Sequence, residues 1–555
     1  MPTLFETFSA SANAIPGILQ ELTAAYSNKP DRWAEIQHRY QSMQSQLWAG
    51  FARASVDGKP CAIVAPQADD KRFRDPAWNA LPFFDFMKQS YLLAANGFNE
   101  LIESAELDPI RKKQVAFHAQ QYLDAVAPSN FLATNPEALQ LALETRGESI
   151  ARGMENLSQD TERGRISMSD ESGFEVGKNL AITPGAVIFE NDYLQLIQYA
   201  PLTTQVYKRP LLIVPPFINK YYILDLQPEN SFVRYALECG YQVFIISWRN
   251  TPPEMGGATW DDYIEHGVFK AMAVARAIAG ADKLNVLGFC IGGTLVSTAL
   301  AVQRAKKRNP ASSLTLLTTM LDFADTGAIS VYVDDDYVEQ CALKYASGGV
   351  MSGADLASSF ASLRANELTW YFVVNNYLKG QTPRAFDLLH WNADSANLPG
   401  ALYAYYIRNM YRENNLKEAG KLTMCKVAID LGKVDMPAYL LASREDHIVP
   451  WQSAYASTRL LSGEIEFVLA ASGHIAGVIN PASKGKRNFW KNNNVPADPE
   501  AWMGAAESVA GSWWGHWSEW LAGHAGKKIA APGELGGKGY SPIEAAPGRY
   551  VKALA

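Results

Sequence analysis

The sequence predicts an α/β protein in which a helical N-terminal domain precedes a doubly wound, mostly parallel sheet. From about residue 211 onward, short apolar runs alternate with helical stretches, which is typical of parallel strands buried on both faces. Residues 1–172 carry apolar side chains at helical spacing and few strand-like runs. The 555 residues are enough for two or three domains, and 48% of them are hydrophobic, which is enough for sizeable cores.

The N-terminal domain, residues 1–172, is predicted to be helical. Apolar residues recur at nearly helical spacing over residues 33–47. Asp108 and Pro109 form an N-cap and first-turn pair, so we expect another helix to begin there. Residues 146–172 are polar and rich in charge, and we expect them to form a linker to the second domain.

The second domain, residues 173–555, begins with a predicted hairpin around Asn191 and Asp192. Thr259 is followed three residues later by Asp262, which resembles a capping box at the start of a helix. The predicted strands are 211–217, 241–248, 284–289, 314–321, 437–443 and 465–473, and the predicted helices are 229–239, 260–279, 292–307 and, near the C-terminus, 512–523.

The alternation of strands and helices is interrupted over residues 322–436. This segment is predicted to be helical and irregular, with many aromatic residues. It follows a strand of the predicted sheet, and open sheets bind ligands at the carboxyl ends of their strands. We therefore interpret residues 322–436 as a cap over that end of the sheet. Trp370, Tyr371 and Trp391 are candidates for lining a dry tunnel there, although each is also explained as core of the cap.

The segment GFCIGG contains a nucleophile turn, with Cys290 between Gly288 and Gly292. Such a turn joins a strand to a helix so sharply that its flanking positions favour glycine. A helix N-terminus favours a thiolate and stabilises nearby negative charge. Cys290 is thus the candidate nucleophile, and the backbone N–H of Ile291 is a candidate donor to an oxyanion. The alternative is a buried structural cysteine in a glycine-rich strand end.

An acid and then a histidine are expected to follow such a nucleophile along the chain, each just past a late strand. Asp446 and His474 occupy these positions. Glu445 is the competing acid, but it lies one residue nearer the strand end. His447 is the competing base, but adjacent side chains diverge, so we interpret it as a residue that supports the catalytic side chains without reacting itself. The alternative is a solvent-exposed surface residue.

The second oxyanion donor of such sites comes from the loop after an earlier strand. Here that loop is PPFINKYYILDLQPENS, residues 215–231. The backbone N–H groups of Phe217, Ile218 and Asn219 are the candidates, and we select Ile218. Asp225 in the same loop is a candidate for orienting the segment, and an ordinary turn or cap aspartate explains it equally well.

Composition and cysteine usage limit the possible partners and compartment. A net charge of −7 gives no overall basic field for nucleic acid. Five widely spaced cysteines without a C-x-x-C pair argue against a disulfide framework and a zinc ribbon. The N-terminus lacks a signal-peptide pattern, and no apolar run reaches the roughly 18 residues of a spanning helix. We expect a cytoplasmic protein with no transmembrane segment.

Several motifs resemble those of the polyhydroxyalkanoate synthases. These are GFCIGG, LLASREDHIVPW, SGHIAGVINPA, PPFINKYYILDLQPENS and the ending APGRYVKALA. TTMLDFADTG and the single long chain resemble the class I members, which include the poly-3-hydroxybutyrate synthases. The resemblance extends from about residue 70 to the end, and residues 1–60 match least.

The resemblance implies an α/β-hydrolase core with a cap, acting on (R)-3-hydroxyacyl-CoA, chiefly 3-hydroxybutyryl-CoA. The products would be a polyester chain and free CoA. By match of motif, Cys290 carries the acyl chain, His474 is the base and Asp446 is the third member. The family uses no metal or redox cofactor, since CoA is part of the substrate and product.

The resemblance further implies a homodimer at the surface of cytoplasmic polyester granules, together with granule-associated proteins. The N-terminal domain would serve dimerisation or granule association. Two alternatives stay open. One is a thioesterase or intracellular polyester depolymerase of the same fold with a cysteine nucleophile. The other is a granule protein without enzymatic activity.

Overall fold

The computed structural model describes residues 4–57 and 62–555, and it divides into two compact units. The helical unit comprises Met1–Asp170 together with Ser358–Arg384. The sheet unit comprises Glu171–Ala357 together with Ala385–Ala555. The division near residue 170 lies close to the expected boundary at 172. Residues 358–384 differ from expectation, because they lie inside the predicted cap segment and yet pack with the helical unit.

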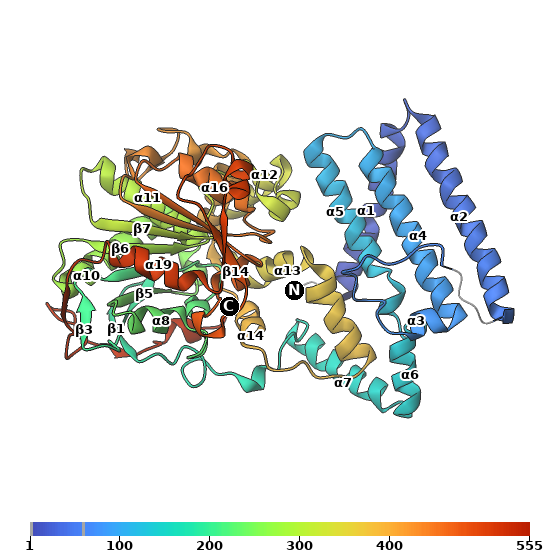
Figure 1. The fold of residues 1–555 in the computed structure, drawn as a ribbon, viewed down its shortest axis with the longest axis horizontal. Helices are drawn as coiled ribbons and strands as arrows, with labels where there is room; N and C mark the ends of the chain where they lie inside the picture. Colours follow the sequence, from blue (N-terminus) through green and yellow to red (C-terminus); the bar gives the residue numbers. More distant parts are fainter. Residues whose placement is uncertain (1–3, 58–61) are drawn as a thin grey trace. The chain divides into compact units, whose positions relative to one another are not determined.

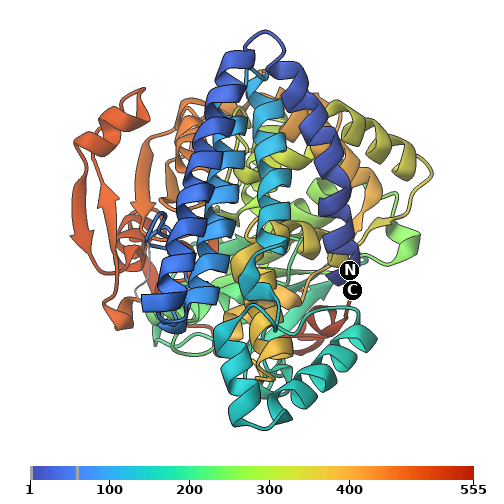
Figure 2. The same ribbon diagram turned by 90° about the vertical axis from the view of Figure 1, so that its right-hand side faces the viewer.

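The helical unit is built around long helices that run side by side (Figures 1 and 2). Its helices are α1 (Leu4–Ala25), α2 (Pro30–Asp57), α3 (Ala77–Ala80), α4 (Pro82–Ser104), α5 (Pro109–Ala125), α6 (Pro136–Glu144) and α7 (Glu148–Arg163). The Asp108 side chain accepts hydrogen bonds from the backbone N–H groups of Ile110 and Arg111, which confirms the predicted cap of α5. Trp370 is buried against Ala125 and Val373 within this unit, so it is core.

The predicted linker over residues 146–172 is wrong, because most of it forms helix α7. The buried face of α7 carries small or polar residues, Ser149, Gly153 and Asp160, instead of an apolar stripe. A Cβ atom on Gly153 would lie 1.9 Å from the carbonyl oxygen of Tyr377, so the two segments approach at backbone distance. The Tyr377 hydroxyl donates to Asp160 at 2.7 Å. Helical periodicity of apolar residues therefore does not reveal this contact.

The sheet unit contains an eleven-stranded sheet in the order β15-β14-β13-β12-β7-β6-β4-β5-β2-β1-β17. The six strands from β13 to β5 pair in parallel, and the strands at both edges pair antiparallel. The strands are β1 (Gly185–Glu190), β2 (Leu194–Tyr199), β4 (Leu211–Val214), β5 (Val243–Trp248), β6 (Leu284–Phe289), β7 (Ala311–Leu317), β12 (Ala438–Ser443), β13 (Ile465–Ala470), β14 (Asn488–Lys491), β15 (Glu507–Ala510) and β17 (Glu544–Ala545). The predicted α/β class, parallel sheet and first hairpin are confirmed, whereas the edge strands after β13 were not predicted.

Helices cover both faces of this sheet, as a doubly wound fold requires (Figure 1). Along β4, Leu212 and Val214 join one apolar cluster, and Leu211 and Ile213 join the other. The first cluster includes α10 (Phe269–Ala279) and α11 (Ile291–Ala305), and the second includes α8 (Phe232–Glu238) and α19 (Trp513–Ala522). The capping box of Thr259 and Asp262 is confirmed.

The segment between β7 and β12 adds no strand to the main sheet among the residues described. In the sheet unit it contains α12 (Asp335–Tyr345), α14 (Asp387–Ala393), α15 (Gly400–Tyr406) and the π-helical turn η9 (Ile407–Arg412), and α13 (Gly353–Ser362) leads into the part that packs with the helical unit. Over the described parts of both units, no helix combines the length and apolarity needed to cross a bilayer.

Candidate active site

Cys290 occupies the turn between β6 and α11 in a strained backbone conformation. Its φ of 53° and ψ of −127° lie in a region that residues other than glycine seldom adopt. The Cys290 N–H donates to the Leu317 carbonyl at 2.9 Å, and the Gly293 N–H donates to the Cys290 carbonyl at 2.8 Å. Neighbouring strand β7 and the first turn of α11 therefore hold the strained residue in place.

The glycines around Cys290 permit backbone contacts that a Cβ atom would prevent. A Cβ on Gly288 would lie 2.4 Å from the Gly293 Cα, and a Cβ on Gly292 would lie 2.4 Å from the Val214 carbonyl oxygen. The sharp turn expected from the glycine spacing is confirmed. Because Gly292 also touches Pro215, the start of α11 packs directly on the loop that follows β4.

Asp446 follows β12 and is held by backbone groups of its own loop. One carboxylate oxygen, Oδ1, accepts hydrogen bonds from the N–H groups of Ile448 and Val449, each at 2.9 Å. The other oxygen, Oδ2, lies 2.6 Å from Nδ1 of His474. The Asp446 side chain is completely buried. Its orientation toward the histidine is therefore fixed from both sides.

His474 is the first residue of α17 (His474–Val478), just past β13, and its ring is buried. The ring stacks on Phe289, with centroids 5.8 Å apart. Burial disfavours the imidazolium, but the Asp446 carboxylate, followed by Cys290, outweighs this and raises the pKa of His474 well above its usual range. The structure therefore brings together the three side chains that the sequence predicts, with His474 between Cys290 and Asp446.

The two predicted oxyanion donors lie at the same end of the sheet. Ile291 is the first residue of α11, directly after Cys290. Ile218 lies in the loop after β4, and β4 pairs in parallel with β6 so that Val214 lies opposite Gly288. The contact of Gly292 with this loop keeps the two segments adjacent. The arrangement favours two N–H groups near one oxyanion.

Asp225 lies in the same loop as Ile218, but its hydrogen bonds go to residues other than Cys290, His474 and Asp446. It is buried and accepts hydrogen bonds from Ser231 Oγ at 2.6 Å, from the Tyr199 hydroxyl at 3.3 Å and from Thr183. Burial raises the pKa of Asp225. These bonds fasten the loop to the start of α8 and to β2, which supports an orienting role for Asp225.

The competing acid and base on the Asp446 loop occupy different surroundings. Glu445 is exposed, and its backbone N–H donates to the Ser472 carbonyl at 3.0 Å. The carbonyl of His447 accepts a hydrogen bond from the Ala328 N–H at 2.9 Å. Nδ1 of His474 lies 2.6 Å from Oδ2 of Asp446, so the geometry favours Asp446 as the acid.

Sequence reasoning missed two tyrosines of the cap, Tyr406 and Tyr411. Their rings are 5.3 Å apart at 78°, at the end of α15 and within η9. Burial raises the pKa of both phenols, and Cys290 contributes in the same direction, so both hydroxyls lie within electrostatic reach of the sulfur. The π-helical turn between them changes the helical register, and only the aromatic richness of the cap hinted at them.

A metal site is not evident in the described ranges, which contain no group of three or more His, Cys, Asp or Glu side chains suited to hold an ion.

Family models match two overlapping parts of the chain. Residues 69–236 match the family described as poly-beta-hydroxybutyrate polymerase (PhaC) N-terminus, and residues 209–481 match the alpha/beta hydrolase fold. The expected α/β-hydrolase core is thereby confirmed.

Full-length relatives are similar over nearly the whole chain. The poly(3-hydroxyalkanoate) polymerase subunit PhaC of Cupriavidus necator is 51% identical, over 98% of this chain and 92% of the relative. The corresponding subunit of Rhizobium meliloti is 37% identical, over 99% of this chain and 90% of the relative. The poly(3-hydroxyalkanoate) polymerase of Methylorubrum extorquens is 39% identical, over 97% and 89%. The chain belongs to the poly(3-hydroxyalkanoate) polymerase family.

Proposed function

We propose that this chain is a class I polyhydroxyalkanoate synthase that polymerises (R)-3-hydroxyacyl-CoA, chiefly 3-hydroxybutyryl-CoA, and releases CoA. The observation that carries the proposal is Cys290 on a strained turn beside the buried His474–Asp446 pair, in a member of the polymerase family. CoA enters and leaves as part of substrate and product, and no further cofactor is proposed.

The first half-reaction moves the acyl group from CoA to Cys290. The Cys290 sulfur gives its proton to His474 and attacks the thioester carbonyl. The oxyanion of the tetrahedral intermediate accepts hydrogen bonds from the N–H groups of Ile291 and Ile218, each worth about 3 kcal/mol. The intermediate collapses, the carbon–sulfur bond to CoA breaks, and the departing sulfur takes the proton from His474.

The second half-reaction forms the ester bond. The 3-hydroxyl of another unit attacks a thioester carbonyl and gives its proton to His474. The carbon–sulfur bond of that thioester then breaks, and the departing sulfur takes the proton from His474. General-base assistance of this kind contributes roughly 100- to 10,000-fold. Asp446 fixes the orientation of His474, and the family resemblance makes it the alternative acceptor of the hydroxyl proton.

Cysteine suits this task better than serine because it preserves the activation of the acyl group. Exchange of one thioester for another is nearly balanced in free energy, whereas a serine ester would be a poorer acyl donor to the next hydroxyl. Water must then be kept from the acyl-enzyme. The buried Tyr406 and the partly buried Tyr411 of the cap would contribute to its exclusion.

The resemblance also extends to the surroundings of the enzyme. We propose a homodimer that works in the cytoplasm at the surface of the polyester granule, with granule-associated proteins as further partners. In this proposal residues 1–172 serve dimerisation or granule association.

The test adds (R)-3-hydroxybutyryl-CoA to the purified protein, follows free thiol and sediments the product. We expect CoA release together with sedimentable polymer. Cys290→Ala should abolish both and Cys290→Ser should reduce both severely. Cys239→Ala, at a partly buried cysteine on the end of α8, is the matched control and should retain activity.

Two results would overturn the proposal. Soluble 3-hydroxybutyrate without polymer would indicate a thioesterase or depolymerase. No CoA release by the folded protein would indicate a granule protein without enzymatic activity.

A further inference from the structure

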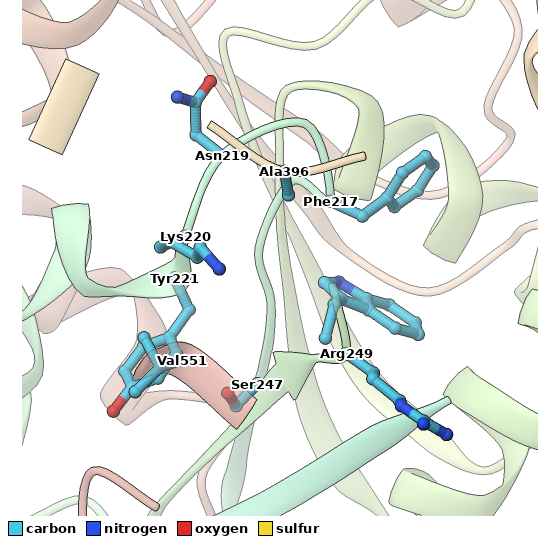
Figure 3. A pocket seen from close by; sticks show the side chains of 9 residues that line it. Phe217, Asn219, Lys220, Tyr221, Ser247, Arg249, Ala396 and Val551 are labelled. Carbon is cyan, nitrogen blue, oxygen red and sulfur yellow. The ribbon is translucent and has the colours of Figure 1, made fainter. Parts of the chain in front are cut away.

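The loop from Phe217 to Tyr222, which we call the oxyanion loop because it contains Ile218, borders a cavity. The cavity has a volume of only about 10 Å³, which is about what one water molecule needs, and it is partly open. The lining residues are Phe217, Asn219, Lys220, Tyr221, Ser247, Trp248, Arg249, Ala396 and Val551 (Figure 3). The buried hydroxyl of Ser247 has no hydrogen-bond partner. Phe217, Lys220 and Tyr221 are buried, so packing and individual hydrogen bonds together determine the position of the loop.

The cap supplies the first set of these hydrogen bonds. The indole N–H of Trp391 donates to the carbonyl of Lys220 at 2.7 Å. The backbone N–H of Ala396 donates to the carbonyl of Ile218 at 2.9 Å. Two backbone carbonyls of the oxyanion loop are thus fixed by the same short stretch of the cap, and one of them belongs to the residue whose N–H is the proposed oxyanion donor.

The C-terminal segment supplies the second set. We call residues 549–554 the strap; it contains the single turn η14 (Tyr550–Lys552) and is anchored by the buried Val551. The ammonium group of Lys220 donates to the carbonyl of Ala553. Figure 3 shows Lys220 and Val551 on the same side of the cavity. The strap therefore contacts the loop two residues from Ile218.

A second contact ties the strap to the cap. The side-chain amide of Asn250 donates to the carbonyl of Leu554 at 2.6 Å. The oxygen of the same amide accepts a hydrogen bond from the Asn397 N–H at 2.8 Å. Strap, cap and oxyanion loop thus form one hydrogen-bonded assembly at the carboxyl ends of β4 and β5.

We infer that the strap and Lys220 set the position of the Ile218 N–H and thereby its strength as an oxyanion donor. Lys220 is a positioning residue in this inference, because its ammonium group bonds to the strap and not to the reacting atoms. Burial makes this ammonium group costly, since only 4% of Lys220 is exposed. The stabilisation that a preorganised N–H donor gives an oxyanion is sensitive to small displacements of that donor. Losing such a donor lowers the rate of acyl transfer by about 100- to 1,000-fold. The inference rests on the proposed acyl transfer at Cys290.

The test compares two reactions of Cys290 in the full-length protein. Acyl transfer from (R)-3-hydroxybutyryl-CoA passes through an oxyanion and is followed as CoA release in a single turnover. Alkylation by iodoacetamide occurs at a saturated carbon and forms no oxyanion at the site. A displaced oxyanion loop should therefore slow the first reaction and leave the second unchanged.

Lys220→Met removes the ammonium group and keeps most of the aliphatic stem. We expect the rate of CoA release to fall by about 10- to 100-fold, which is at most the effect of losing one oxyanion donor. The rate of alkylation should stay within about twofold of wild type. Asn250→Ala should act in the same direction with a smaller loss. Hydrogen exchange of residues 217–222 should rise in both variants, while exchange of β6 stays unchanged. Lys484→Met, at an exposed lysine of the same unit, should change nothing.

The possible outcomes separate this inference from the proposed function. Unchanged CoA release in Lys220→Met, with wild type active, would overturn the role of the strap alone. Equal losses of CoA release and alkylation in both variants would show general damage to the site and would also overturn it. No CoA release by wild type would overturn the proposed function. The inference about positioning the Ile218 N–H would then fall as well, because no oxyanion would form at the site.

Discussion

The Asp446 carboxylate lies 2.6 Å from Nδ1 of His474, and both side chains are almost completely buried. A carboxylate only accepts hydrogen bonds, so Nδ1 carries the proton in this contact. The opposite ring nitrogen is then left for Cys290. Because two backbone N–H groups hold the other carboxylate oxygen, the acid cannot turn without losing three hydrogen bonds. This pair fixes the ring orientation of His474 that the proposed acyl transfer at Cys290 requires.

Replacing Asp446 by asparagine should therefore lower activity strongly while keeping the size and shape of the side chain. The amide would favour the wrong tautomer of His474, and we expect the rate of CoA release to fall on the order of 1,000- to 10,000-fold. Glu445→Gln is the matched control, since Glu445 is the exposed neighbour of Asp446. Equal activity of wild type and Asp446→Asn, or a comparable loss in Glu445→Gln, would contradict the assignment of Asp446 as the acid.

The protonation of His474 should depend on Asp446. Burial alone would lower the pKa of His474, and the carboxylate and Cys290 together raise it well above 6.5. Nitrogen NMR of histidine-labelled protein should therefore show His474 losing its second ring proton at a higher pH than an ordinary histidine does. In Asp446→Asn, burial remains while the carboxylate is gone, so the pKa should fall. A His474 signal that titrates at the same pH in both proteins would refute this explanation.

The sequence predicted the parts of the fold that follow from periodicity and turn chemistry. The parallel strands are continuous apolar runs, and the turn at Cys290 is marked by its glycines, so both could be recognised without tertiary information. Asp446 and His474 could be placed because each directly follows a late strand, and the parallel sheet brings such positions to one edge.

Other features depend on contacts that local patterns do not encode. Helix α7 packs through Ser149 and Gly153, so the sequence has no apolar stripe that would predict a packed helix there. Tyr406 caps a π-helical turn and Tyr411 lies within it, and the ordinary helical period does not describe such a turn. The bond from Lys220 to Ala553 joins residues 333 positions apart, and neither residue carries a recognisable motif.

The buried ammonium group of Lys220 should make stability depend on pH in the alkaline range. Burial lowers the pKa of Lys220 from its ordinary 10.5, partly offset by Asp394. Between the lowered value and 10.5, the unfolded chain binds the proton more tightly than the folded chain, so this group's contribution to stability rises with pH. Denaturation of wild type and Lys220→Met at pH 7, 8.5 and 10 should show the difference moving in favour of wild type as pH increases. A difference that stays constant or falls would contradict this.

Gly292→Ala should damage both stability and acyl transfer, because the start of α11 rests on the backbone after β4. The added Cβ would lie 2.4 Å from the Val214 carbonyl oxygen and 2.6 Å from that of Pro215, and neither backbone atom can rotate away. Relief requires α11 to move away from the loop that carries Ile218, which separates the two proposed oxyanion donors. We expect a loss of about 1–3 kcal/mol in the free energy of unfolding, as in other overpacked cores, and a lower rate of CoA release.

Gly515→Ala is the control, since its Cβ would meet nothing within 4 Å inside α19 and alanine favours a helix by up to about 1 kcal/mol. Wild-type stability and activity in Gly292→Ala would mean that the oxyanion donors do not depend on this backbone contact.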